Sequence, residues 1–458
     1  MKAIGARVPR YDGRLHVTGQ TRYVDDISMP GMLWAKALRS PIDSGRIVSL
    51  DTSRAEALNG VHAVVTHRDP ARNTVGHLED VGVPPDMPLL AEDEVRFKGQ
   101  VIAAVAADTR EIAQRAIDSI DVRFEERPAL LDVRSALDPD APQVTPNGNT
   151  YVYGPYDHTR VRKGDVDQAF DEAHLIVKGT YRTQAVEQAP LETQVALAIP
   201  ESDGRITVHS TTQAMYFSMG IVAKHLGLKL NQVKFVGGTV GGGFGGKVDT
   251  WTEPIAALLA VKARRPVKYR ATREDEFLSL STRAAWHIEI ADAVTRDGWI
   301  LGRRTLTLHD AGAYTGFSAY GTMKNVHHSA GAYTIPNVFM NSYVVYTNHT
   351  PATAMRGFGV TCVSYAVETH MNRVAEQLDI SPWEFRLKNA NRVGDLTPTR
   401  VELEDPSAVP TLLACAEQAG VELPPEFTAM TSSPRSGDLL PPHLEGQRLR
   451  ADAWRQKS

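Results

Sequence analysis

The chain has 458 residues, of which 42% are hydrophobic and 23% charged, so a largely disordered chain is excluded. A formal net charge of -4 leaves no basic excess to neutralise a phosphate backbone, which disfavours a nucleic acid partner. Two cysteines, Cys362 and Cys415, are too few for a disulfide framework or a four-cysteine metal site. No apolar run approaches the roughly 18 residues that span a bilayer, and the N-terminus lacks the apolar core of a signal peptide. We therefore expect a cytoplasmic protein.

Residues 1–126 are predicted to form small α/β units. Residues 99–108 form a nearly continuous apolar run, which is typical of a strand buried on both faces. Thr109 precedes a segment that we expect to be helical as far as Ser119. Further strands are expected at 34–40, 46–51, 61–67 and 121–126. Residues 127–160 then contain five prolines and are predicted to be a linker.

Residues 161–420 are predicted to form a second, α+β region, and residues 421–458 a polar tail. Ser381 followed by Pro382 marks the start of a helix. After about residue 396, only the stretch near 412–419 has a helical pattern. The remaining expected helices are 215–226, 253–262 and 361–378, and the expected strands are 175–183, 194–201, 206–213 and 231–238.

The strongest local signal is VGGTVGGGFGGK at residues 236–247, which we call the glycine loop. Glycine allows backbone N–H groups to approach a ligand closely, so the loop predicts a binding site, with a flexible linker as the plainer alternative. Gly241, Gly246 and Lys247 also match the P-loop pattern of an NTPase. Val248 stands where that pattern requires a Ser or Thr to hold Mg²⁺, which disfavours this alternative.

A second signal is HTPATAMRGFG at 349–359, whose last six residues we call the AMRGFG segment (354–359). Arg356 between small residues is suited to hold an anionic group, and Phe358 between two glycines has room to stack on a planar substrate. The alternative is a tight turn with Phe358 in the core. Gln213 ends the sequence STTQ, and its side-chain amide is able to donate a hydrogen bond to a ligand.

An ordered set of motifs resembles the molybdopterin-binding subunit of the xanthine oxidase family of molybdenum hydroxylases, in its split-subunit form similar to nicotinate dehydrogenase. The set comprises GxxRYxDD from Gly19, LRSP at 38–41, TQ at 212–213, GGGFGGK at 241–247, DAGAY at 310–314, YTIPN at 333–337 and AMRGFG at 354–359. The fold that the resemblance implies is an N-terminal hammerhead-like α/β domain, followed by the first part of a molybdopterin-binding α+β domain.

The resemblance also implies where the cofactor and the substrate lie. Gln213 would donate to an oxygen ligand of molybdenum, Arg356 would support the pterin, and Phe358 would stack on the substrate. The implied cofactor contacts are Gln213, Gly242, Gly243, Phe244, Gly245, Ala354, Met355 and Arg356, with no metal ligand supplied by a side chain. The implied reaction is hydroxylation of an N-heteroaromatic compound or an aldehyde with water as the oxygen source.

One departure from the family pattern is the missing Gly-Val-Gly-Glu motif, which bears the catalytic base. We therefore expect no catalytic base in this chain, but one on a second molybdopterin-subunit polypeptide. The family further implies a molybdopterin cofactor, with the cytosine dinucleotide form expected, and partners that carry [2Fe–2S] clusters and FAD.

Two residues bear on the substrate. Val248 stands where purine oxidisers carry a glutamate, and Lys324 lies near where they carry an arginine that orients the substrate. These differences disfavour purines and favour a planar aromatic acid or an aldehyde; the alternative for Lys324 is an ordinary surface lysine. A different class of function is a non-catalytic fragment or cofactor-handling scaffold of the same fold.

Overall fold

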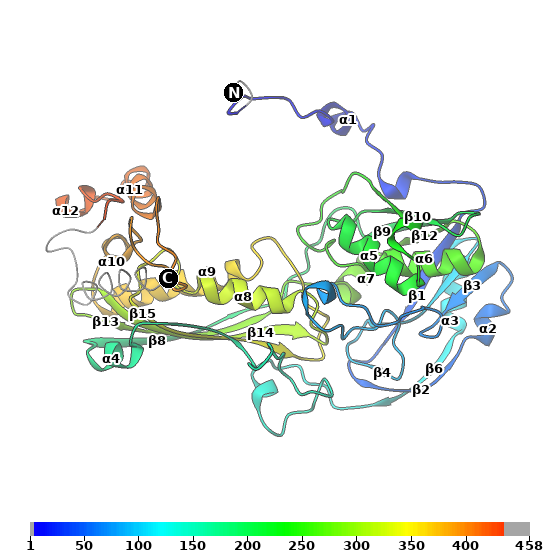
Figure 1. Cartoon of the computed structure of the whole chain (residues 1–458), viewed down its shortest axis with the longest axis horizontal. Helices are drawn as coiled ribbons and strands as arrows, with labels where there is room; N and C mark the ends of the chain where they lie inside the picture. Colours follow the sequence, from blue (N-terminus) through cyan, green and yellow to red (C-terminus); the bar gives the residue numbers. More distant parts are fainter. Residues whose placement is uncertain (1–3, 435–458) are drawn as a thin grey trace.

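The computed structural model describes residues 4–434, which form two lobes, each built on one large sheet (Figure 1). The sheet of the first lobe has seven strands in the order β11-β10-β9-β12-β1-β5-β3. Their bounds are β1 (Leu33–Arg39), β3 (Val61–Val65), β5 (Val101–Ala107), β9 (Val195–Pro200), β10 (Ile206–Ser210), β11 (Val233–Gly237) and β12 (Val267–Arg270). Strands from the N-terminal region and strands beyond residue 190 thus share one sheet, joined by the parallel pairing of β1 with β12. The domain boundaries at 126 and 160 remain predictions.

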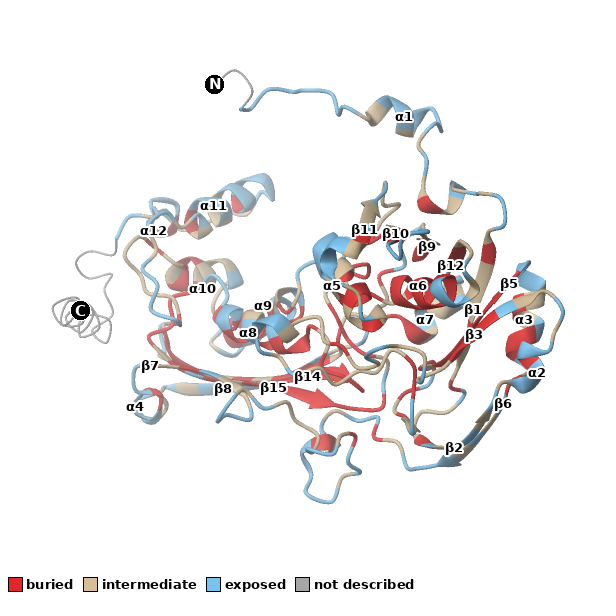
Figure 2. Ribbon diagram, turned by 45° about the vertical axis from the view of Figure 1, so that its right-hand side comes forward, coloured by how far each residue is buried: buried red, intermediate tan, exposed pale blue. Residues whose placement is uncertain are grey.

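Strand β5 accounts for the long apolar run, because it is buried on both faces. Ala104 and Ala106 pack in the cluster that includes α5 (Met215–Leu226) and α6 (Thr252–Ala263). The alternate residues Ala103 and Val105 pack in the cluster that includes α3 (Arg110–Ser119). Figure 2 shows α6 and the neighbouring strands of this lobe as largely buried. As predicted, Thr109 caps α3, and its side chain accepts a hydrogen bond from the backbone N–H of Ile112.

Smaller elements complete the first lobe. A three-stranded sheet has the order β4-β2-β6, with β2 (Gly45–Asp51), β4 (Glu94–Val95) and β6 (Asp121–Glu126). The helices α2 (Ser53–Glu56) and α7 (Arg273–Ser279) belong to the same lobe, while α1 (Gly13–Val17) lies apart from both sheets (Figure 1). The strand expected to run to residue 213 ends at Ser210, so residues 211–213 leave the sheet edge.

The second lobe is built on a five-stranded sheet of order β7-β15-β14-β13-β8. Helix α9 (Val360–Gln377), expected at 361–378, packs on this sheet with Val363, Val367 and Val374. Of these strands only β8 coincides with an expected one. The bounds are β7 (Thr159–Lys163), β8 (Leu175–Thr183), β13 (Trp286–Val294), β14 (Ile300–Gly312), β15 (Asn337–Tyr346), α4 (Val166–Asp171), α8 (Ser318–His328) and α9 (Val360–Gln377).

The C-terminal helices differ in part from the expectation. As predicted, Ser381 caps α10 (Pro382–Asn389). The helix expected near 412–419 begins earlier, as α11 (Ala408–Gln418), and a short α12 (Pro425–Thr428) follows it. Phe427 of α12 is buried against Leu387 and Val409, so the start of the predicted polar tail is packed on the fold. Residues 435–458 of that tail lie outside the described part. Within residues 4–434, every helix is too short or too polar to cross a membrane.

Candidate functional site

The glycine loop leaves the end of β11 and turns back over the segment before β9. The backbone N–H of Gly241 donates to Glu192 Oε2 at 2.7 Å, and Lys247 Nζ donates to the same oxygen at 2.8 Å. The Lys247 side chain is 1% exposed, and burial lowers its pKa. A P-loop lysine must reach a bound phosphate, whereas this one is held inside the protein by Glu192. The loop is therefore not arranged as a phosphate-binding P-loop.

Gln213 is oriented by the glycine loop. Its Oε1 accepts hydrogen bonds from the backbone N–H of Gly245 at 3.0 Å and of Lys247 at 3.3 Å. A backbone N–H group only donates, so the side-chain oxygen has to face the loop and the NH₂ group has to face away from it. The exposed amide nitrogen is thus available to a ligand, in agreement with the donor role expected for Gln213.

Packing inside the protein requires glycine at two positions of the loop. A Cβ on Gly243 would lie 2.4 Å from Gln213 Oε1, and a Cβ on Gly245, whose φ is +103°, would lie 2.4 Å from the carbonyl oxygen of Ala354. At both positions a side chain would collide with another part of the protein, so glycine is required for the packing of the loop. The expected contact of these residues with the cofactor stays a prediction.

The loop nevertheless presents free donors. Within residues 4–434, no acceptor is found for the backbone N–H groups of Gly242, Gly243 and Phe244. Phe244 has a φ of +52° and its side chain is 49% exposed. Successive unpaired N–H groups beside positive φ values are a common arrangement for binding anions or partially negative oxygens. Together with the Gln213 amide, this donor set fits an oxygen-rich, anionic group such as molybdopterin.

The AMRGFG segment lies directly beside the glycine loop. The backbone N–H of Arg356 donates to the carbonyl oxygen of Phe244 at 2.9 Å, and Gln188 Nε2 donates to the carbonyl oxygen of Ala354 at 3.0 Å. Arg283 also contacts the segment, with Nε 3.3 Å from the Met355 sulfur. The predicted cofactor residues of the two motifs are therefore neighbours in space.

Phe358, the proposed substrate contact, rests on α8. Its half-buried ring lies 6.1 Å from the ring of Tyr320, measured between centroids, and Lys324 Nζ lies 5.2 Å from the Tyr320 centroid. Within the described residues, Lys324 has no carboxylate partner. Phe358 and Lys324 thus share one surface, with Tyr320 between them. Val248 is half-buried, and its backbone N–H donates to the carbonyl oxygen of Gly245 at 3.2 Å.

Four residues that support the site were not found from the sequence. Gln194 Nε2 donates to the carbonyl oxygen of Gly246 at 2.9 Å, and Arg283 Nη2 donates to the carbonyl oxygen of Arg356 at 2.7 Å. The other two are Gln188 and Glu192. All of them contact residues distant in the sequence, and no periodicity or spacing pointed to these contacts. Within residues 4–434, no three His, Cys, Asp or Glu side chains gather as a metal site.

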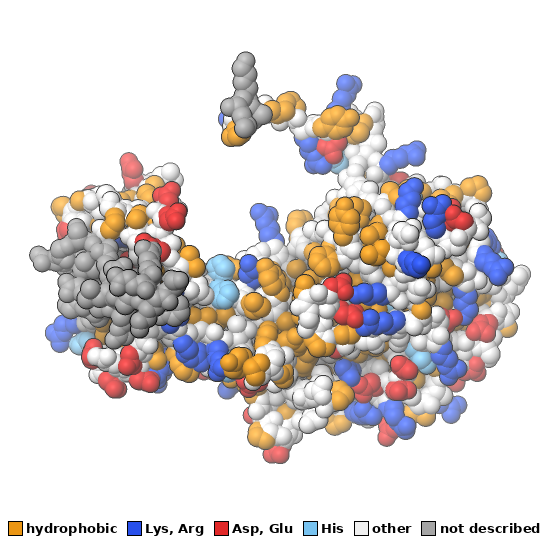
Figure 3. Space-filling model, viewed as in Figure 1, with side chains coloured by type: hydrophobic (Ala, Val, Ile, Leu, Met, Phe, Trp, Pro, Cys, Tyr) orange, Lys and Arg blue, Asp and Glu red, His pale blue; other side chains and the backbone are white. Residues whose placement is uncertain are grey.

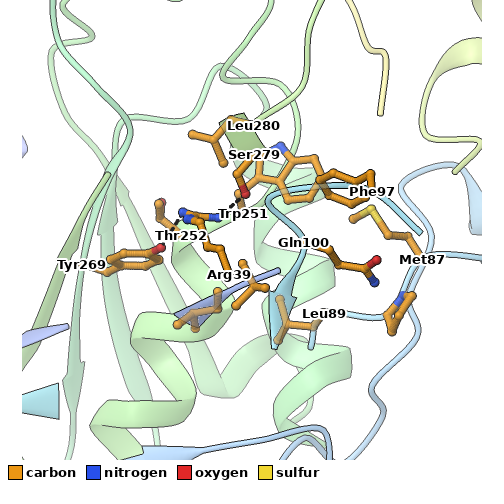
Figure 4. A pocket seen from close by; sticks show the side chains of 13 residues that line it. Arg39, Met87, Leu89, Phe97, Gln100, Trp251, Thr252, Tyr269, Ser279 and Leu280 are labelled. Carbon is orange, nitrogen blue, oxygen red and sulfur yellow. Dashed lines mark hydrogen bonds between the residues drawn. The ribbon is translucent and has the colours of Figure 1, made fainter. Parts of the chain in front are cut away.

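A small cavity lies elsewhere, between the N-terminal strands and α7 (Figure 4). Arg39, from the LRSP motif, crosses it and bonds Asp275 Oδ1 at 2.8 Å, the Tyr269 hydroxyl at 2.9 Å and the hydroxyl of Ser279. Burial raises the pKa of Tyr269 to about 12. The cavity volume of about 20 Å³ admits a single water. The bonds of Arg39 join the N-terminal strands to α7 and β12 in this lobe.

Comparison with known proteins agrees with this arrangement. Residues 146–390 match the molybdopterin cofactor-binding domain, and residues 18–128 match the a/b hammerhead domain of aldehyde oxidase and xanthine dehydrogenase. The large molybdopterin subunit of nicotinate dehydrogenase from Eubacterium barkeri is 32% identical over 92% of this chain and 97% of its own length.

Other relatives are much longer than this chain. A probable xanthine dehydrogenase subunit from Bacillus subtilis is 37% identical over 85% of this chain and 51% of its own length. The structure of aldehyde oxidoreductase from Desulfovibrio gigas superposes with a TM-score of 0.84 at 30% identity, over 90% of this chain and 46% of that one. The chain thus spans about half the length of several relatives. It belongs to the molybdopterin-binding subunits of the xanthine oxidase family, and its fold is the hammerhead domain followed by the molybdopterin-binding domain.

Proposed function

We propose that this chain is the large cofactor-binding subunit of a multi-subunit molybdenum hydroxylase that acts on an N-heteroaromatic compound or an aldehyde. The observation that carries the proposal is the donor set of the glycine loop, in which Gln213 is turned outward by two backbone N–H groups. When bound, the molybdenum cofactor supplies the redox chemistry, with water as the source of oxygen. The residues of this chain bind and orient the reactants.

The cofactor contacts follow from the geometry of the two loops. Gln213 Nε2 and the N–H groups of Gly242, Gly243 and Phe244 would donate to oxygen atoms of the cofactor, while Gly245, Ala354 and Met355 hold the two loops together. Arg356 is exposed, and its main chain is fixed at both N–H and C=O. Its guanidinium would hold an anionic part of the pterin. We propose the cytosine dinucleotide form of the cofactor.

The substrate would lie over Phe358, with Lys324 close enough to attract a carboxylate. Val248 presents no side-chain hydrogen-bonding group, so a pocket that includes it would not satisfy the polar edge of a purine. A planar aromatic acid fits this combination better than a purine does. Nicotinate is one such acid, and an aldehyde is the second class.

The partners would complete the site. A second molybdopterin-subunit polypeptide would supply the catalytic base, and further subunits would carry [2Fe–2S] clusters and FAD. Exposed apolar residues lie at or next to the donor groups and Glu192 in the sequence: Tyr216 is 78% exposed, Phe217 50%, Leu191 96% and Phe244 49%. Figure 3 shows hydrophobic side chains gathered on the face that carries α5. We propose that the second polypeptide covers this face and that the complex is cytoplasmic.

Purification of the complex with its associated chains tests the proposal. We expect stoichiometric molybdenum and pterin, together with iron and a companion polypeptide, and turnover of an aromatic acid or an aldehyde. The competing function is a non-catalytic scaffold of the same fold, favoured only by the chain's half-length match to several relatives. A metal-free chain that purifies alone would support the scaffold and contradict the enzyme.

A further inference from the structure

Gly321 lies in the first turn of α8. At this residue the ring of Phe358, the proposed substrate contact, meets the buried core. A Cβ built on Gly321 would lie 2.9 Å from Cε2 and 2.9 Å from Cζ of Phe358, and 2.9 Å from His309 Cε1. The Phe358 ring and the imidazole therefore both approach α8 at Gly321, with no room for one methyl group beside them. Gly321 thus determines how deep the Phe358 ring lies.

The His309 ring is not able to move aside. His309 is fully buried in β14, and its ring lies 4.3 Å from the ring of Trp286, measured between centroids. Burial lowers the pKa of His309 to about 3, so the ring is neutral at physiological pH. Displacing it would move the centre of the five-stranded sheet, because it lies between the sheet and α8.

The main chain at Gly359, directly after Phe358, is also fixed. Asn325 Nδ2 donates to the carbonyl oxygen of Gly359 at 3.1 Å. A Cβ on Gly359 would lie 2.3 Å from the carbonyl oxygen of Gly321, so the two main chains are in direct contact. The half-buried Phe358 ring is the one part of this contact that borders open space.

We propose that Gly321 is a positioning residue that sets substrate selectivity by allowing the Phe358 ring to lie close to α8, which leaves room above the ring for a planar substrate. The inference rests on the proposed function, because it requires Phe358 to contact the substrate. A methyl group at 321 needs contacts of at least about 3.5 Å to both rings. Because His309 does not yield, the first turn of α8 has to move away from it, and the Phe358 ring is displaced outward by roughly 0.6 to 1 Å. Such a displacement is enough to change the rate and the binding of a bulky planar substrate.

The test compares Gly321→Ala with Gly13→Ala in the purified holo-complex. Gly13 lies in α1, away from both sheets, and a Cβ there would meet only Arg10 Cβ, at 3.4 Å, so Gly13→Ala is a helical control. We expect Gly321→Ala to raise KM for a two-ring heteroaromatic substrate about tenfold, with a much smaller change for a small aliphatic aldehyde. A crystal structure of the variant should show the Phe358 ring displaced outward, which is a readout independent of turnover. An unmoved ring, or equal effects on both substrates, would overturn the inference.

A second variant covers the case in which Gly321→Ala does not fold. If the ring is what the methyl group displaces, adding Phe358→Leu should restore folding, whereas continued misfolding would place the clash at His309 and overturn the inference. Phe358→Ala separates this inference from the proposed function. If Phe358→Ala leaves all substrates unaffected, the stacking role itself fails. If Phe358→Ala lowers kcat/KM for planar substrates while Gly321→Ala does not, only the role of Gly321 fails.

Discussion

The glycine loop and the AMRGFG segment are joined by a backbone hydrogen bond between Phe244 and Arg356, yet different contacts support them. The glycine loop is held by polar side chains, since Gln213, Gln194 and Glu192 all bond its main chain. Phe358, at the end of the AMRGFG segment, rests instead on tightly packed main chain and a neutral ring. The cofactor side is thus preorganised by hydrogen bonds, and the substrate side by packing. Polar groups fixed in this way retain their orientation when charge changes nearby.

The largest effect should follow from Gly243→Ala, because the new methyl group would collide with the Gln213 side chain that the loop orients. We expect molybdenum and pterin occupancy of the purified complex to fall more than tenfold. Gly243→Val should be at least as severe. The matched control is Gly237→Ala, whose Cβ would lie 3.5 Å from the Met215 sulfur, an ordinary contact. Full molybdenum and pterin occupancy in the Gly243 variants would show that the loop does not hold the cofactor.

Glu192→Gln tests whether polar contacts hold the glycine loop. The substitution leaves the buried Lys247 without its carboxylate, and breaking such a pair costs about 3 kcal/mol of unfolding free energy. Denaturant unfolding of the variant measures this loss. Asp203→Asn, which removes an exposed pair with Arg205, should cause no measurable change. Equal stability of the two variants would show that the loop does not depend on Glu192.

Phe358→Ala tests the substrate side of the site, where the Phe358 ring is held by packing. Removal of the ring should reduce the transition-state stabilisation of a planar substrate by about 1–3 kcal/mol, calculated from kcat/KM, because the stacking surface is lost. Molybdenum occupancy should be unchanged, since the glycine loop is held by other contacts. Loss of the metal in this variant would mean that the two sides are not supported independently.

The smallest effect concerns pH. Burial lowers the pKa of His309 to about 3, whereas in the unfolded chain it is about 6.5. Below pH 6.5 the unfolded chain binds a proton that the folded chain does not, so stability falls as the pH falls from 6.5 toward 3. When the pH falls from 7.5 to 5.5, the free energy of unfolding of His309→Leu should therefore decrease by about 1.4 kcal/mol less than that of the wild type. Denaturant unfolding at both pH values measures the difference, and identical pH dependence would contradict a neutral His309.

The sequence predicted the elements whose signals are local. The apolar run of β5 and the caps at Thr109 and Ser381 indicated their elements, since capping and burial on both faces leave short patterns. The pairing of β13, β14 and β15 was missed, because buried polar residues interrupt their apolar alternation. Arg303 and Asp292 form a fully buried ion pair with a separation of 2.6 Å in this sheet.

The candidate site was predicted in part. The order of the motifs indicated that Gln213, the glycine loop and the AMRGFG segment belong together, and the structure places them side by side. The supports at Gln188 and Arg283 join segments 166 and 73 residues apart, and no periodicity or spacing encodes such contacts. The packing of Phe358 on Gly321 was missed for the same reason, since it depends on how α8 crosses the loop.

The most direct measurement is an experimental structure of the assembled, cofactor-loaded complex. The account predicts that the metal end of the pterin lies within hydrogen-bonding distance of Gln213 Nε2 and of the backbone N–H groups at Gly243 and Phe244. It also predicts that a glutamate of a companion polypeptide faces the same point. A pterin bound far from Gln213, or a catalytic carboxylate supplied by this chain, would contradict it.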